Sequence, residues 1–342
     1  MVPSVKPVIA VTFGDASGIG PELVAKLLAR PESRAAATIV LVGDAWVWAA
    51  GKRAAGLDPE VRRIDGLAAA RMAADDVPML LAIDTVAEAE VIPGQVTAAA
   101  GRGARAALTH CLDAATRGEI DAICFAPLNK QALKQGGMRF EDELHFFADY
   151  LGVNDYFCEF NTLGSLWTSR ISSHIPLAEV PKLVTKERIK AAARLTLVTL
   201  RQAGFAAPRI GLAALNPHGG DGGTCGREEI DVIAPAAAEL NAEGLVIQGP
   251  YPADTIFLKA RDGQLDAVVT MYHDQGQVAI KLLGFERGVT VQGGLPIPIA
   301  TPAHGTAFDI VGRNRANVEA TVQAFLLAAR MGAGHRLRGL AA

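Results

Sequence analysis

The sequence predicts an α/β protein, and two alternating patterns carry this prediction. Short apolar runs rich in strand-forming residues occur at VIAVTF (8–13), TIVLVG (38–43), DAICFA (121–126), RIGLAAL (209–215) and LDAVVTMY (265–272). Longer amphipathic segments lie between them, as in GPELVAKLLAR (20–30), VTAAAGRGARAALTHCLDAATRG (96–118) and VTKERIKAAARLTLVTLRQAG (184–204). Such alternation is typical of βαβ units, and near-continuous apolarity suits strands that are covered on both faces.

Composition narrows the class of protein. The chain has 342 residues, half of them apolar, which is enough for two packed domains. Its formal net charge is -3 and its basic residues are dispersed, so neither nucleic acid nor a membrane surface is an expected partner. The N-terminal apolar stretch is too short for a secretory signal, and no apolar span approaches twenty residues. We therefore expect a cytoplasmic enzyme that acts on a small molecule.

Polar segments follow the predicted strands, where ligands of α/β sheets collect. The first strand leads into GDASGIGPE, in which Gly18 and Gly20 permit a tight turn and close backbone approach. This segment either cradles a phosphate or is merely a turn. The third strand leads into APLNKQAL, where Lys130 is either a solvated charge or a ligand contact.

Three of the seven histidines, His174, His218 and His273, follow β-like runs. A lone histidine at a strand end is more often a hydrogen-bonded structural residue than a ligand. Three histidines with an open fourth position are, however, a known way to hold a catalytic divalent metal, most often zinc. Their spacings of 44 and 55 residues match no compact metal motif, so both explanations stay open.

The ordered motifs of the chain resemble those of one family. GDASGIGPE, APLNK, SHIPL, LNPHGGDGGTCGREEID, GPYPADTIF, MYHDQG and HGTAFDIVG are similar to the motif series of the PdxA family, the 4-hydroxythreonine-4-phosphate dehydrogenases. The first and last also resemble motifs of isocitrate and isopropylmalate dehydrogenases. The resemblance implies a two-domain α/β subunit with an interdomain active-site cleft, in a homodimer whose subunits share active sites. We expect residues 1–127 and 285–342 to bind the cofactor, and 128–284 to bind metal and substrate and to dimerise.

The resemblance also implies a metal site and an acid–base group. The metal ligands would be His174, His218 and His273, the last contributed across the dimer, with Zn, Mn, Mg or Co as the ion. Lys281 falls on the family's substrate-contacting lysine, and Asp254 on an acid near the site. Lys281, Asp254 and Lys130 are the candidates for moving the catalytic proton.

The HGTAFD segment would bind the adenosine half of NAD. Asp309 is the expected ribose contact, and His304, Gly305, Gly18 and Gly20 are expected cofactor-binding residues. The implied chemistry is oxidation of a metal-bound hydroxyl with hydride transfer to NAD, followed by decarboxylation of the β-keto acid.

The chain departs from the family pattern around the substrate. Where phosphate-binding members carry TGHTE, this chain has Glu143 and Leu144, and Thr290 and Ile299 replace an asparagine and an arginine. These four positions are the expected substrate contacts, together with Lys281. Loss of the arginine predicts an unphosphorylated hydroxy acid such as a terephthalate-type cis-dihydrodiol. The alternatives are 4-hydroxythreonine 4-phosphate itself, and a catalytically silent metabolite-binding protein.

Overall fold

A computed structural model describes residues 6–73 and 75–341. The first five residues of the N-terminal segment, whose apolar stretch bears on secretion, lie outside this range. The chain forms two compact units, residues 1–154 with 295–342 (unit 1) and residues 155–294 (unit 2). Within the described residues, no helix has the length and apolar character needed to cross a bilayer. Both units combine helices with a sheet, so the predicted α/β class is confirmed.

Unit 1 contains a parallel sheet in the order β3-β4-β2-β1-β5-β12. Its strands are β1 (Val8–Thr12), β2 (Thr38–Gly43), β3 (Arg62–Ile64), β4 (Met79–Ala82), β5 (Ala122–Phe125) and β12 (Ile299–Pro302). Its α-helices are α1 (Gly20–Leu28), α2 (Pro31–Ala36), α3 (Ala45–Ala55), α4 (Ala98–Thr116), α5 (Lys130–Gln135), α6 (Glu143–Tyr150) and α12 (Glu319–Ala341). The three apolar runs predicted as strands in this unit therefore form β1, β2 and β5.

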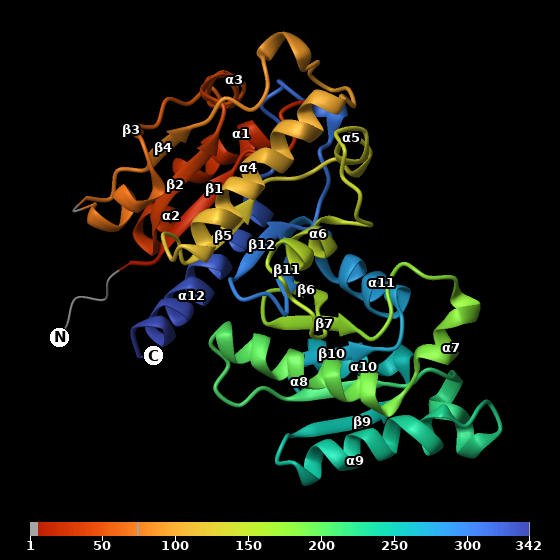
Figure 1. Ribbon diagram of the computed structural model, residues 1–342. Coiled ribbons are helices and arrows are strands. Elements are labelled where there is room, and N and C mark those ends of the chain that lie inside the picture. Colours follow the sequence, from red (N-terminus) through yellow and green to blue (C-terminus); the bar gives the residue numbers. More distant parts are fainter. Residues whose placement is uncertain (1–5, 74, 342) are drawn as a thin grey trace. The chain divides into compact units, whose positions relative to one another are not determined.

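Helices cover both faces of the unit 1 sheet, as Figure 1 shows for α4 and α12. Val8 and Ala10 share a buried cluster with α4 residues such as Leu108, whereas Ile9 lies against Gly332 of α12. Successive side chains of a strand point to opposite faces, so a continuous apolar run is what this sandwich requires. The Ala-rich stretch near residue 70 forms a short 3-10 helix, Leu67–Met72.

Unit 2 contains a mixed sheet in the order β11-β6-β7-β10-β8-β9. Its strands are β6 (Cys158–Leu163), β7 (Leu166–Arg170), β8 (Ile210–Ala213), β9 (Ile247–Tyr251), β10 (Ala267–Thr270) and β11 (Val289–Gly293). Its α-helices are α7 (Val180–Leu183), α8 (Lys186–Gln202), α9 (Ala234–Ala242), α10 (Ala253–Arg261) and α11 (His273–Gly284). Strands β7, β10, β8 and β9 run parallel, and β6 is antiparallel to both β7 and β11.

The unit boundaries lie at 154/155 and 294/295, whereas the boundaries expected from the sequence are 127/128 and 284/285. The difference has a packing reason, because α5 and α6 add Leu133, Phe146 and Phe147 to the core of unit 1. Strand β11 in turn pairs with β6 of unit 2. The roles expected for the two parts, cofactor binding and metal binding with dimerisation, stay predictions.

Candidate active site

The three predicted metal ligands lie beyond the ends of three neighbouring strands of unit 2. His174 follows β7, His273 follows β10 as the first residue of α11, and His218 follows β8. These strands are parallel and adjacent, so their carboxyl ends share one edge of the sheet. The rings of His174 and His273 have centroids 5.8 Å apart. Ligand atoms of all three histidines do not gather into one cluster within the described part of this chain.

His273, one of the predicted metal ligands, is oriented by its neighbour Asp274. Its Nδ1 lies 2.7 Å from Oδ1 of Asp274, which leaves Nε2 to serve as the ligand atom. A carboxylate on the distal nitrogen is the usual partner of a metal-bound histidine, because it fixes the tautomer and the ring direction. Gln275 fixes the turn itself: it accepts from Met271 N and donates to Ala214 O, both at 2.8 Å. An imidazole held in this way has the chemistry that a divalent metal accepts as a ligand.

His218 stands in a strained loop, residues 216–223, after β8. Its φ is 56°, in the left-handed region, and Asp221 has a φ of 44°. Non-glycine residues adopt this conformation at a cost of about 1–3 kcal/mol, and such strain gathers at functional sites. Glycines 219, 220 and 222 take positive φ values at no comparable cost. The loop thus keeps the His218 backbone in the left-handed conformation and leaves its imidazole exposed.

A buried carboxylate clamps the start of the His218 loop. Glu229, which is 3% exposed, accepts hydrogen bonds from the backbone N–H groups of Leu215 and Asn216 through Oε1. Its Oε2 accepts from the Asn216 amide at 2.9 Å. Burial raises the pKa of Glu229, but the hydrogen bonds from Asn216 and Leu215 outweigh burial and lower the pKa overall. The ionised form is therefore the one that holds the loop.

This clamp predicts acid sensitivity. The folded pKa lies below the usual 4.5, so the stabilisation is present above that value and is lost as pH falls through the folded pKa. Glu229→Gln should lower the free energy of unfolding by roughly 1–3 kcal/mol at pH 7, because the amide cannot accept all three hydrogen bonds. When thermal unfolding is measured at several pH values, the difference in stability between the Glu229→Gln variant and the native chain should become smaller below pH 4.5. The control is Asp231→Asn, which removes an exposed ion pair with Arg227. A difference in stability between Glu229→Gln and the native chain that stays constant with pH would contradict the clamp.

In unit 1 the two predicted cofactor segments touch each other. A side-chain carbon on Gly18 would lie 2.9 Å from Cβ of Thr306, and Ile19 N donates to Thr306 O. Gly20 packs as closely on the backbone oxygen of Phe13, at 2.1 Å from where its Cβ would be. Only glycine permits these approaches. GDASGIGPE and HGTAFD thus form one surface.

His304, the first residue of HGTAFD, is half-buried. Burial lowers the pKa of His304, and the contact of Nδ1 with Gly305 O at 3.1 Å only partly opposes it. The imidazole is therefore neutral near pH 7. Gly305 and Asp309 are exposed, which leaves the Asp309 carboxylate accessible to a ligand hydroxyl.

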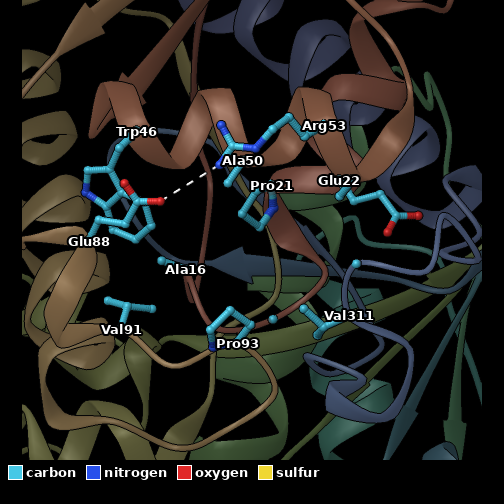
Figure 2. Close-up of a pocket in the computed structure, with 13 residues that line it drawn as sticks. Ala16, Pro21, Glu22, Trp46, Ala50, Arg53, Glu88, Val91, Pro93 and Val311 are labelled. Atoms are coloured by element: carbon cyan, nitrogen blue, oxygen red, sulfur yellow. Dashed lines mark ion pairs between the residues drawn. The ribbon is translucent and has the colours of Figure 1, made fainter.

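A cavity of about 420 Å³ opens beside Gly18 in unit 1 (Figure 2). Its walls are largely apolar and include Pro21, Val91 and Pro93, and Gly312 closes the side next to the HGTAFD segment. Figure 2 shows the Arg53–Glu88 ion pair, 3.8 Å long, beside Trp46 at one rim of the cavity. The Trp46 indole donates to Val86 O at 2.8 Å, which fixes the ring. No sequence motif indicated Trp46, Arg53 or Glu88.

The other predicted residues are divided between the units. In unit 1, Lys130 is exposed at the start of α5, Glu143 is half-buried at the start of α6, and Leu144 and Ile299 are buried. In unit 2, Asp254 is exposed in the first turn of α10, Lys281 is exposed on α11, and Thr290 is buried on β11. Their assignment to catalysis or substrate binding stays a prediction.

Comparison with known families decides the relationship. The profile described as "Pyridoxal phosphate biosynthetic protein PdxA" matches residues 35–328. The chain belongs to the PdxA family. The predicted class, an NAD-dependent dehydrogenase acting on a CH–OH group, is thereby confirmed, and dehydrogenases of this family also depend on a divalent metal.

Curated relatives of this PdxA chain are named for phosphorylated substrates. The "Putative 4-hydroxythreonine-4-phosphate dehydrogenase 2" of Pseudomonas aeruginosa is 53% identical, with 95% of this chain and 97% of that protein covered. The protein of the same name from Rhizobium meliloti is 45% identical, with 98% and 97% covered. A "Putative D-threonate 4-phosphate dehydrogenase" of Bradyrhizobium diazoefficiens is 39% identical, with 95% and 97% covered.

Among solved structures, one of a 4-hydroxythreonine-4-phosphate dehydrogenase is more similar to this chain than one of a terephthalate dihydrodiol dehydrogenase. The 4-hydroxythreonine-4-phosphate dehydrogenase of Klebsiella pneumoniae has a TM-score of 0.82 at 33% identity, with 96% of this chain and 99% of that chain covered. A terephthalate 1,2-cis-dihydrodiol dehydrogenase of Burkholderia xenovorans has a TM-score of 0.68 at 28% identity, with 95% and 98% covered.

These relatives correct the expectation of an unphosphorylated, terephthalate-type substrate, which is wrong. That expectation treated Ile299 in place of an arginine as evidence against a phosphate. A phosphate is also bound by lysine and by backbone N–H groups at helix N-termini, so one missing guanidinium does not exclude it. The alternative substrate, 4-hydroxythreonine 4-phosphate, is the one favoured by the relatives.

Proposed function

We propose that this PdxA protein oxidises the hydroxyl group of a phosphorylated hydroxy acid, with 4-hydroxythreonine 4-phosphate as the leading substrate. The observation that carries the proposal is the 53% identity, over nearly the whole chain, to a relative named for that substrate. D-threonate 4-phosphate is the second candidate, supported by the 39% identical relative that carries its name. Both molecules present a phosphate and a secondary hydroxyl.

His174, His218 and His273 are the proposed metal ligands, and Asp274 orients His273. A divalent metal bound there would polarise the substrate hydroxyl and stabilise negative charge on the oxygen during decarboxylation. Lys281 and Asp254 belong to the same unit as the histidines, and Lys130 to the other. We assign proton transfer to this group of three, with Lys281 also contacting substrate.

We place the adenosine half of NAD at the surface formed by GDASGIGPE and HGTAFD. The cavity beside Gly18 supports this placement, because its apolar walls suit a nucleobase. Asp309 would accept a hydrogen bond from a ribose hydroxyl and repel a 2'-phosphate, which favours NAD over NADP. Completion of each active site by the partner subunit of a homodimer belongs to the same proposal.

The substrate proposal is tested by following NAD reduction with Mn²⁺ or Zn²⁺ present. We expect kcat/KM for 4-hydroxythreonine 4-phosphate to exceed that for unphosphorylated 4-hydroxythreonine by at least about a hundredfold, since an unmatched phosphate site costs several kcal/mol of binding. D-threonate 4-phosphate, assayed in parallel, ranks the two candidates. Equal rates with and without the phosphate would overturn the assignment.

A further inference from the structure

Unit 2 contains a buried arginine whose guanidinium is held by three polar partners. Arg170, the last residue of β7, is 5% exposed. Its guanidinium donates to Glu159 Oε2 at 2.7 Å, to Asn161 Oδ1 at 2.8 Å and to Ser173 Oγ at 3.0 Å. A buried charge requires such polar partners, and replacing it is costly unless the partners are replaced with it.

Asn161 connects this arginine to two further elements. It lies on β6 and is 6% exposed, and its Oδ1 also accepts from Nε2 of Gln277 on α11. Its Nδ2 donates to Thr290 Oγ1 at 3.1 Å. Asn161 and Thr290 are direct partners in the β6–β11 ladder. We call these six residues, Glu159, Asn161, Arg170, Ser173, Gln277 and Thr290, the Arg170 network.

The network reaches the candidate active site from two sides. On α11, His273, Gln277 and Lys281 are spaced four residues apart, so they share one helix face with Gln277 in the middle. On the other side, Ser173 directly precedes His174. Hydrogen bonds therefore run from Ser173 through Arg170 and Asn161 to Gln277. They join the segment of His174 to the helix that begins with His273, and the rings of these two histidines have centroids 5.8 Å apart.

We propose that the Arg170 network is a positioning device for the active site. It holds α11 against the His174 segment, and so sets the directions in which His273 and Lys281 project from α11. Asn161 supplies from β6 the amide that the family pattern carries at position 290, where this chain has threonine. The inference rests on the proposed metal and substrate roles of these residues, and extends them to positions that touch neither ligand.

The test combines single variants of Asn161 and Gln277 with a double variant that exchanges the side chains of Asn161 and Thr290. Asn161→Ala and Gln277→Leu each cut the link to α11, and both should weaken Mn²⁺ binding to the metal-free protein by about tenfold or more, as loss of outer-shell support does. KM for the phosphorylated substrate should rise by a similar factor, because Lys281 loses its fixed direction. The double variant Asn161→Thr/Thr290→Asn moves the amide to the paired strand and should restore both quantities to within a fewfold of native.

One control variant and two features of the design make the outcome decisive. Arg209→Ala breaks an exposed ion pair with Asp266 in the same unit and should change neither quantity. Gln277 is only half-buried, so Gln277→Leu tests the link even if Asn161→Ala does not fold. Mn²⁺ affinity, measured by calorimetry without substrate, reads the network even if the substrate assignment fails. Native Mn²⁺ affinity and native KM in a folded Gln277→Leu protein, with only the unfolding midpoint lowered, would overturn the proposal.

Discussion

His218→Ala should abolish metal-dependent turnover while leaving the fold intact. Loss of an outer-shell partner alone costs 10- to 100-fold, so loss of a ligand should lower kcat/KM by more than about a hundredfold. His218 is exposed in a loop, so its removal takes little packing from the core. The measurements are NAD reduction, calorimetric Mn²⁺ binding and circular dichroism.

The backbone of His218 calls for a second variant. At a φ of 56°, alanine keeps the strain of the left-handed conformation, whereas glycine removes it. His218→Gly therefore separates loss of the imidazole from a change in loop conformation, and it should be as inactive as the alanine variant. His110→Ala, on α4 of unit 1, is the histidine control. Native turnover in His218→Gly would remove His218 from the metal site.

Mixing two inactive variants asks which chain supplies His273. If His273 completes the partner's site, a heterodimer of His218→Ala and His273→Ala subunits retains one intact site, and mixing should restore about a quarter of native activity. Within one chain, however, the rings of His174 and His273 already lie 5.8 Å apart. No recovery after subunit exchange would assign His273 to its own chain's site.

The sequence predicted five strands whose residues are nearly all apolar and missed two neighbouring strands that mix apolar and polar residues. Strands β1, β2, β5, β8 and β10 coincide with the five apolar runs. Strands β6 and β7 carry buried polar residues such as Asn161, Thr168 and Arg170, so neither shows the pattern of a covered strand. Asn161 and Arg170 also belong to the Arg170 network, so the polar positions concealed both the β6–β7 hairpin and its connection to the site.

The location of the candidate site could be predicted from the sequence, but the contacts that support it could not. Its edge could be predicted because ligands of parallel sheets gather where strands end, and the three histidines do follow adjacent strands. The partners of Arg170 could not be predicted, since residues 161, 170, 277 and 290 are brought together only by strand pairing and helix packing. One signal was present: Gln277 is four residues from both His273 and Lys281. The substrate was misjudged because one absent arginine was weighed without knowledge of the other donors.

Asp15→Asn should make the protein more stable relative to the native chain as pH rises. Asp15 follows β1 in the GDASGIGPE segment and is 1% exposed. Its Oδ1 accepts from Ser17 N at 2.8 Å, while Oδ2 has no hydrogen-bond partner among the described residues. Burial raises the pKa of Asp15 from 3.8 to about 6, and the hydrogen bonds from Ser17 only partly oppose it.

The sign follows from linkage. The folded pKa is the higher one, so the contribution of Asp15 to stability is fully present below pH 3.8 and is lost as pH rises to about 6. The shift corresponds to a loss of about 3 kcal/mol, because folding above pH 6 must bury an ionised carboxylate. Asparagine has no charge to bury, so the difference in unfolding free energy between variant and native chain should grow by most of that amount, about 2.4 kcal/mol, between pH 4 and pH 7.

Chemical denaturation followed by tryptophan fluorescence across this pH range measures the difference. Its pH dependence is the decisive quantity, because a buried amide that lacks an acceptor adds a cost of about 1–3 kcal/mol that does not vary with pH. Asp58→Asn, at a side chain 84% exposed in the same unit, controls for the loss of one negative charge. A stability difference between Asp15→Asn and the native chain that does not change from pH 4 to pH 7 would contradict the prediction. It would mean that some group other than Ser17 stabilises the ionised Asp15 carboxylate.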